Sequence, residues 1–250
     1  MIPIYDTEPA DWKDLQNRVG KIFSDMGFTA SVEKDIETVR GIVNADVYAE
    51  KTAQLTREVH ICECKLWNAP IPKSVVHSFR TVISDYGANA GYIISKNGFQ
   101  SGAIEAAKNS NVFLLTFNEF QNEIREKWLD YVVDELEKVG YPFRKITDPM
   151  ESFYDKKLNQ FDEKKKEHIL KLMAKYHTLS LSSFRLNYKH AISGQLEIEW
   201  IDDVITNNIK RFPQDANLTC LMNYFDYLKE FCINGLQEFD ELYGEPLRKW

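Results

Sequence analysis

The chain has few cysteines and lacks both of the usual sequence signals for a membrane. Four cysteines in 250 residues are too few for a disulfide scaffold. The sequence contains no run of about 18 apolar residues, the minimum for a membrane-spanning helix. Its first residues, MIPIYDTEPADW, lack a basic segment followed by an apolar stretch, so we expect no signal peptide. These absences predict a reduced, soluble, cytoplasmic protein without a membrane partner.

An excess of positive charge is also missing. The formal net charge is −7, which argues against a protein that coats nucleic acid non-specifically. A local basic stripe could still bind phosphate while the remaining surface is acidic. The hydrophobic fraction of 44% and the charged fraction of 28% are typical of a globular protein. We find no repeat and no low-complexity linker, and the length allows one large domain or two small ones.

The first half of the chain alternates between helical and strand patterns. A helix is predicted over 9–27, where Asp11 can cap it and apolar residues recur at helical spacing. Three strands are predicted next, at 28–39, 42–49 and 57–67, and two prolines then introduce a helix over 73–86. A strand at 90–95, a helix rich in small residues over 100–109 and a strand at 112–116 follow. The order α-β-β-β-α-β-α-β predicts a mixed sheet flanked by helices.

The pattern changes at about residue 117 and becomes mainly helical. A long amphipathic helix is predicted over 117–139, ended by the Gly-Tyr-Pro-Phe stretch at 140–143. A charged helix is predicted over 152–175 and an irregular stretch over 178–194. Two further helices are predicted over 195–211 and 216–243. We therefore predict an α/β domain over 1–120 and a mainly helical domain over 121–250, whose role could be target recognition, regulation or partner binding.

Two acidic residues fall on neighbouring predicted strands. Asp46 lies in IVNADVYAE, and Glu63 and Lys65 lie in VHICECKLW. If the hairpin between them is centred near Gln54 and Leu55, Asp46 lies opposite Glu63 on the same face. Lys65 points the same way, because side chains alternate along a strand. The sequence thus predicts two carboxylates and an ammonium group at one spot.

This arrangement suits a divalent-metal phosphodiesterase. Asp46 and Glu63 would supply the hard oxygen ligands that Mg²⁺ prefers, and the Cys64 carbonyl could add another. Lys65 would orient a water molecule or neutralise charge that develops on the scissile phosphate. A simpler interpretation is a cross-strand ion pair on a solvated face. The apolar residues Val59, Ile61 and Trp67 share that face, which favours the catalytic interpretation.

A succession of segments resembles the Mrr-type restriction endonucleases of the PD-(D/E)xK nuclease superfamily. It covers roughly residues 12–116 in the order and spacing of that family. The similar segments are Leu15-Gln16-x-x-Val19-Gly20-x-x-Phe23, Gly27-Phe28, Val39-Arg40-Gly41-x-x-x-Ala45-Asp46-Val47, Glu63-Cys64-Lys65, Gly91-Tyr92-Ile93-Ile94-Ser95 and Gly98-Phe99-Gln100-x-Gly102-Ala103-x-x-Ala106-Ala107.

The resemblance implies a restriction-endonuclease-like fold and a Mg²⁺-dependent endonuclease that cuts DNA, often in defence against foreign DNA, with Mn²⁺ able to replace Mg²⁺. It implies that Asp46, Glu63 and Lys65 are catalytic. Gln16 occupies a first-helix position where the family often places Glu or Gln near the metal. Nothing after about residue 120 resembles the family, so the biological target stays open.

Several weaker signals border this site. Lys73, His77 and Arg80 form one polar stripe on the helix over 73–86, which either contacts phosphate or is an ordinary solvated face. Gln100 and Ser101 begin the next helix, where they could hold a phosphate or simply cap the helix.

A zinc site is a further alternative. His60, Cys62 and Cys64 alternate on the face opposite Glu63, but a fourth ligand is not visible nearby. Cysteines in such an apolar strand are usually buried, and we favour that interpretation.

Two other functions fit the sequence. The acidic balance and the aromatic residues of the second half would also suit a non-catalytic or gated module that docks a protein partner. The same three residues would equally serve a repair nuclease acting on RNA or branched DNA. A homodimer is plausible, because cutting both strands requires two active sites or two encounters.

Overall fold

The computed structural model describes residues 1–53, 55–148, 157–193, 198–244 and 246. These residues form two compact units, one made of 7–131 and the other of 1–6 with the described part of 132–250. The division falls inside a helix, whereas the predicted boundary was at residue 120. No described helix combines the length and the apolar character that crossing a membrane requires.

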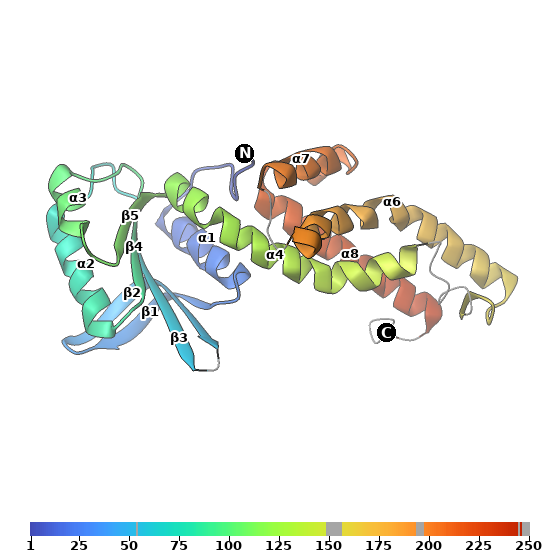
Figure 1. The fold of residues 1–250 in the computed structure, drawn as a ribbon, viewed down its shortest axis with the longest axis horizontal. Helices are drawn as coiled ribbons and strands as arrows, with labels where there is room; N and C mark the ends of the chain where they lie inside the picture. Colours follow the sequence, from blue (N-terminus) through green and yellow to red (C-terminus); the bar gives the residue numbers. More distant parts are fainter. Residues whose placement is uncertain (54, 149–156, 194–197, 245, 247–250) are drawn as a thin grey trace. The chain divides into compact units, whose positions relative to one another are not determined.

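The first unit contains a five-stranded mixed sheet (Figure 1). Its strands lie in chain order across the sheet: β1 Thr29–Thr38, β2 Gly41–Ala53, β3 Thr56–Lys65, β4 Ala90–Ser95 and β5 Val112–Thr116. The first three strands pair antiparallel, and β3, β4 and β5 pair parallel. The predicted order of elements and the restriction-endonuclease-like α/β fold are confirmed.

Helices cover both faces of this sheet (Figure 1). Helix α1, Trp12–Asp25, begins where the Asp11 carboxylate accepts the Asp14 N–H at 2.8 Å. Its apolar side packs on one face, with Phe23 against His60 and Tyr92. The other face is covered by α2, Lys73–Tyr86, and α3, Ser101–Ala107. The sheet is therefore buried between two layers, which brings the ends of β2 and β3 into a partly desolvated position.

Helix α4, Phe117–Thr147, corrects one sequence prediction. We expected it to end at 140–143, but it continues through Pro142, which cannot donate a backbone hydrogen bond. The residues just beyond the proline explain this, since Phe143 and Ile146 are fully buried in the helical core. Burying two large side chains offsets the backbone bond that the proline removes.

The other helices are α6 Glu163–Ser193, α7 Ile198–Ile209 and α8 Leu221–Tyr243, with a short 3₁₀ turn at Gln214–Ala216. The predicted irregular stretch over 178–194 is wrong as far as Ser193. Its serine-rich composition disfavours helix, but the Ser180 hydroxyl finds partners in the His177 carbonyl and the Thr147 hydroxyl.

The start of α6 also differs from the prediction of one helix over 152–175. Residues 149–156 lie outside the described residues, and 159–162 form a turn. Asp162 then caps α6 by accepting the Lys165 N–H at 2.8 Å. Because Asp162 caps it, α6 begins as a separate helix inside the segment that we predicted as a single helix.

The first residues of the chain cap the last helix. Cys220 precedes α8 but makes no side-chain cap bond. Instead, the Leu221 and Met222 N–H groups donate to the carbonyls of Pro3 and Ile4 at 2.9 and 3.0 Å. Ile4 is fully buried. Two of the N–H groups that every helix leaves without an internal partner are thus satisfied by a distant segment.

Candidate active site

The register of β2 and β3 brings Asp46 and Glu63 together. Ala53 pairs with Thr56 at the turn, and the ladder runs as far as Val47 opposite Cys62. The next position along the two strands places Asp46 opposite Glu63, so the predicted register is confirmed. The ladder ends there because the Asp46 carboxylate accepts the Cys64 N–H at 2.7 Å. This bond fixes one oxygen of Asp46 at the end of β3.

Lys65 closes the cluster from the last position of β3. Its Nζ atom lies 3.7 Å from the Asp46 Oδ2 atom and forms a tighter ion pair with Glu63 Oε1. The three side chains are between 19% and 25% exposed, so they are reachable from solvent but only partly hydrated. Two carboxylates and one ammonium group therefore share a single, semi-buried spot.

Burial controls the protonation of this cluster. It raises the pKa of Glu63, and the charge of Asp46 acts in the same direction, whereas Lys65 opposes both. Burial alone would lower the pKa of Lys65, but its hydrogen bond to Glu63 and the negative charges around it raise the pKa overall. A cation beside Glu63 is therefore stabilising, and in this structure Lys65 supplies it.

Gln16 lies on the buried side of α1 and has an unused oxygen. Its side chain is 3% exposed, and its Oε1 atom has no hydrogen-bond partner among the described residues. A buried amide oxygen without a hydrogen-bond partner lowers the stability of the fold by about 1–3 kcal/mol, so this oxygen is a candidate ligand for a metal ion. The structure shows no contact of Gln16 with Asp46 or Glu63 among the described residues; the two carboxylates and the Cys64 carbonyl are the hard oxygen donors grouped at the end of β3, the kind that suits Mg²⁺.

The zinc alternative has weaker support. Burial raises the pKa of the Cys62 and Cys64 thiols well above the ordinary value, which disfavours the thiolate that zinc requires. His60 Nε2 is hydrogen-bonded to Glu58 Oε1 at 2.7 Å. Among the residues that the structure describes, no three His, Cys, Asp or Glu side chains are grouped so as to hold a metal.

The predicted phosphate-binding residues lie along α2 and at the start of α3. The Arg80 guanidinium is held against α3, because its Nη1 atom donates to the Ala106 carbonyl at 2.7 Å. Lys73 and His77 are exposed on the same side of α2. Gln100 and Ser101 are exposed at the start of α3, and Gln100 makes no side-chain cap bond. Four of these five side chains are thus available to a ligand.

Two further residues lie beside the cluster, Trp67, which we expected on this face, and Lys96, which sequence reasoning missed. Trp67 is 45% exposed, and the Lys65 Nζ atom lies 5.9 Å from its ring centroid. Lys96 is exposed and follows Ser95, which pairs with Lys65 in the parallel register of β3 and β4. The signal that could have found Lys96 is the parallel pairing itself, because it brings adjacent strand ends to one edge.

An acidic residue on the second strand, Glu-x-Lys on the third, and a mixed sheet between two helical layers define the PD-(D/E)xK class of nucleases. Residues 7–124 match the model of the Mrr catalytic-domain family, which is described as a restriction endonuclease. This match covers the same segment as the predicted resemblance of residues 12–116 and confirms that the first part of the chain is similar to an Mrr-type catalytic domain.

Two further comparisons add little. No curated protein gave a significant match. A crystal structure of a protein of unknown function, AF1548, aligns with 67% of this chain and 99% of its own chain, at 17% identity and a TM-score of 0.37. That likeness carries no argument.

Proposed function

We propose that the first domain is a metal-dependent endonuclease that hydrolyses DNA. The observation that carries this proposal is the convergence of Asp46, Glu63 and Lys65 at the end of β3, in a domain of a nuclease family. A structural ion pair needs only one acid. Here a second carboxylate is held semi-buried beside the first, which is costly unless a further cation or substrate uses it.

Asp46, Glu63 and the Cys64 carbonyl would hold Mg²⁺, or Mn²⁺ in its place, and we place the Gln16 amide oxygen near it. When bound, such an ion lowers the pKa of water and stabilises charge on phosphate. Asp46 keeps its position through the Cys64 N–H, so one carboxylate is oriented before any ligand arrives. Glu63 is the carboxylate that burial disfavours, and it gains most from a nearby cation.

Lys65 would act on the reacting phosphate or water. Its raised pKa keeps it protonated at neutral pH, so it can donate hydrogen bonds to the oxygens on which negative charge develops. Trp67 limits the approach from one side, since its exposed ring lies near the ammonium group.

DNA would be contacted locally rather than over the whole surface, because the net charge of the chain is −7. The exposed side chains of Lys73, His77, Gln100, Ser101 and Lys96 are the phosphate contacts we propose. We further propose a cytoplasmic role in restriction of foreign DNA, with the helical unit selecting the target or binding a protein partner.

Plasmid cleavage tests the proposal. Wild type is assayed with Mg²⁺, with Mn²⁺ and with EDTA, on methylated and unmodified plasmid. Asp46→Ala and Lys65→Ala should each reduce cleavage by about 100-fold or more, since the three groups act as a unit. Lys108→Ala is the matched control, because Lys108 is exposed just after α3 and pairs with Glu105. It should cleave like wild type.

Two outcomes would contradict this function. Cleavage that survives EDTA, or that is indifferent to both substitutions, would remove the proposed site. No cleavage of either plasmid by folded wild type would favour the gated or non-catalytic module. Assays on RNA and branched DNA, run in parallel, separate the repair alternative, which should cut those substrates in preference to plasmid.

A further inference from the structure

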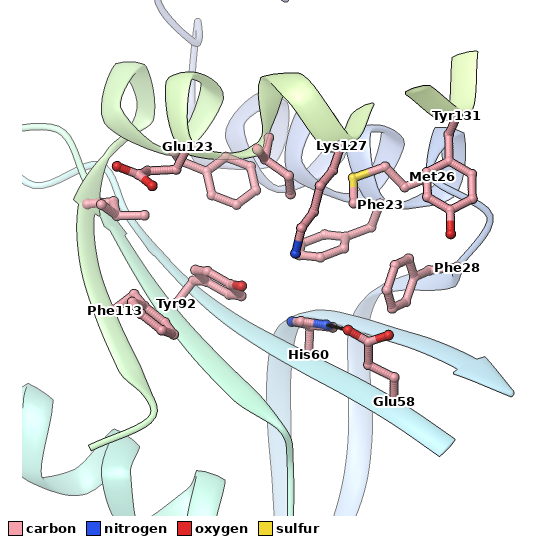
Figure 2. A pocket seen from close by; sticks show the side chains of 13 residues that line it. Phe23, Met26, Phe28, Glu58, His60, Tyr92, Phe113, Glu123, Lys127 and Tyr131 are labelled. Carbon is pink, nitrogen blue, oxygen red and sulfur yellow. Dashed lines mark hydrogen bonds and ion pairs between the residues drawn. The ribbon is translucent and has the colours of Figure 1, made fainter. Parts of the chain in front are cut away.

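The first unit contains a hollow lined by aromatic side chains (Figure 2). It lies on the sheet face opposite the Asp46–Lys65 cluster. Along β3, His60 alternates with Glu63 and Lys65, so its side chain points to the other face. There α1, β3, β4, β5 and the first part of α4 surround a cavity of about 610 Å³. This volume is in the range of small-molecule sites, which span about 300–1,000 Å³.

The floor of the cavity is a row of stacked rings. The Tyr92 ring stacks on His60 at 5.7 Å and 24°, and on Phe113 at 5.4 Å and 23°. Phe28 meets His60 edge-on, and Phe23 closes the side toward α1. Phe113 is 49% exposed, so its ring is open to solvent. The open Phe113 ring at the end of this row offers a face on which a planar heteroaromatic group can stack.

Two polar groups at this cavity have no hydrogen-bond or ion-pair partner among the described residues. Figure 2 shows the Lys127 ammonium group projecting from α4 toward the rings, and no described residue pairs with it. The buried Nδ1 atom of His60 also has no partner in the described part of the chain. Burial raises the pKa of Tyr92 to about 12, so its hydroxyl remains neutral. An apolar ligand would leave the His60 nitrogen unsatisfied, which is unfavourable.

The charges around the cavity favour an anion over a cation. Lys51 reaches its rim, with its Nζ atom 3.8 Å from the Tyr131 ring centroid and 5.5 Å from that of Phe28. A second ammonium group, Lys127, lies over the middle. Of the two carboxylates, Glu58 is engaged by His60, which leaves Glu123 at the edge. A cationic ligand would therefore meet two ammonium groups.

We propose that this cavity binds a nucleotide. The base would stack on the Phe113 ring beside Tyr92, and the phosphate would lie against Lys127. The sugar hydroxyls would reach the Glu123 carboxylate. The site is separate from the nuclease residues and does not depend on their function, because its walls lie on the other sheet face.

The test is isothermal titration of the full chain with AMP, GMP, CMP and UMP, each beside its nucleoside. At least one monophosphate should bind in the micromolar to low millimolar range, and more tightly than its nucleoside. Lys127→Met should weaken the monophosphate about tenfold and leave the nucleoside unchanged, because it removes one charge-assisted contact. Phe113→Ala should weaken both. Lys108→Met is the control and should bind like wild type.

Three results would overturn the proposal: no saturable binding of any monophosphate to wild type at about 5 mM, affinities that neither pocket variant changes, or binding lost in Asp46→Ala. The last would assign the ligand to the nuclease site. If Phe113→Ala fails to fold by circular dichroism, Phe113→Leu keeps an apolar side chain at this half-exposed position while removing the stacking face. Asp46→Ala should retain binding even if the protein proves not to cleave DNA.

Discussion

At the scale of single residues, Glu63 is a carboxylate whose environment opposes its charge. It is semi-buried next to Asp46, and Lys65 is the cation that the structure places beside it. Burial raises its pKa, and this has a consequence for folding as well as for chemistry. A residue that is unfavourable in the folded state but retained at a cluster of ligands is what a functional site predicts.

The pH dependence of stability should reveal how much the semi-buried charge of Glu63 destabilises the fold. Because the folded protein raises the pKa of Glu63, its contribution to stability is complete below the ordinary value of 4.5 and is lost as the pH rises through the folded value. Glu63→Gln cannot titrate. Relative to this variant, wild type should therefore lose free energy of unfolding as the pH rises above about 4.5, measured in urea titrations. A difference that stays constant, or grows in favour of wild type, would contradict the assignment.

Gly91 offers a packing prediction on β4. A Cβ atom there would come within 2.7 Å of side-chain atoms of Ile83 and Phe79, closer than real contacts allow. Gly91→Ala should therefore lower the free energy of unfolding by about 1–3 kcal/mol. Gly102→Ala is the control in α3, where the new atom would sit 3.6 Å from Lys73 and the helix would gain up to about 1 kcal/mol. Chemical denaturation measures both, and equal effects would show that α2 does not pack this closely.

The sequence was sufficient to place Asp46 against Glu63, because a short hairpin fixes register and alternation fixes faces. It could not show that Lys96 lies at the same edge, since that depends on which strands pair in parallel. Nor could it assign His60 to an aromatic cavity. The rings around His60 come from α1, β4 and β5, and a pattern within one segment does not reveal contacts between segments.

At the scale of elements, the sequence indicated two helix ends that a capping residue or a glycine marks. Asp11 begins α1, and Gly87, at φ 74°, ends α2. The errors lie where tertiary burial outweighs local preference. Pro142 does not end α4, because the following turn carries Phe143 into the core. The serine-rich part of α6 stays helical where a hydroxyl such as that of Ser180 has a buried partner.

Pro142 should therefore destabilise the helix that contains it. Pro142→Ala restores a donor for the Lys138 carbonyl and removes the clash of the ring with the preceding turn. We expect the free energy of unfolding of the helical unit to rise by about 1–3 kcal/mol. Tyr141→Ala, at the neighbouring exposed position, should change it by less than about 1 kcal/mol. A loss of stability in Pro142→Ala would mean that the core around Phe143 requires the bend.

At the scale of the molecule, the two compact units do not follow the order of the chain. Residues 1–6 belong with 132–250, and 7–131 form the nuclease unit. Composition could not reveal this, because α4 crosses the boundary as one continuous helix and six residues are too few to show a pattern. Ile4 contributes a fully buried side chain, and Pro3 and Ile4 contribute two carbonyls to the start of α8.

Deletion of residues 1–6 should consequently destabilise the helical unit and spare the other. Losing the buried Ile4 side chain and two capping bonds should cost about 2–5 kcal/mol. Hydrogen exchange followed by mass spectrometry can resolve the two units, and faster exchange should be confined to the described helices after residue 131. Ile4→Ala should reproduce much of the effect. Equal loss of protection in the β-sheet would refute the division.

The capping of α8 by Pro3 and Ile4 also sets an order of events during synthesis. Ile4 is synthesised before its partner Met222, which follows roughly 200 residues later, a delay of about 10–40 s at usual elongation rates. All the strands and helices of the sheet domain emerge in that interval. The nuclease fold can therefore be complete while the apolar side chain of Ile4 is still exposed, and a chaperone could cover it until α8 has been made.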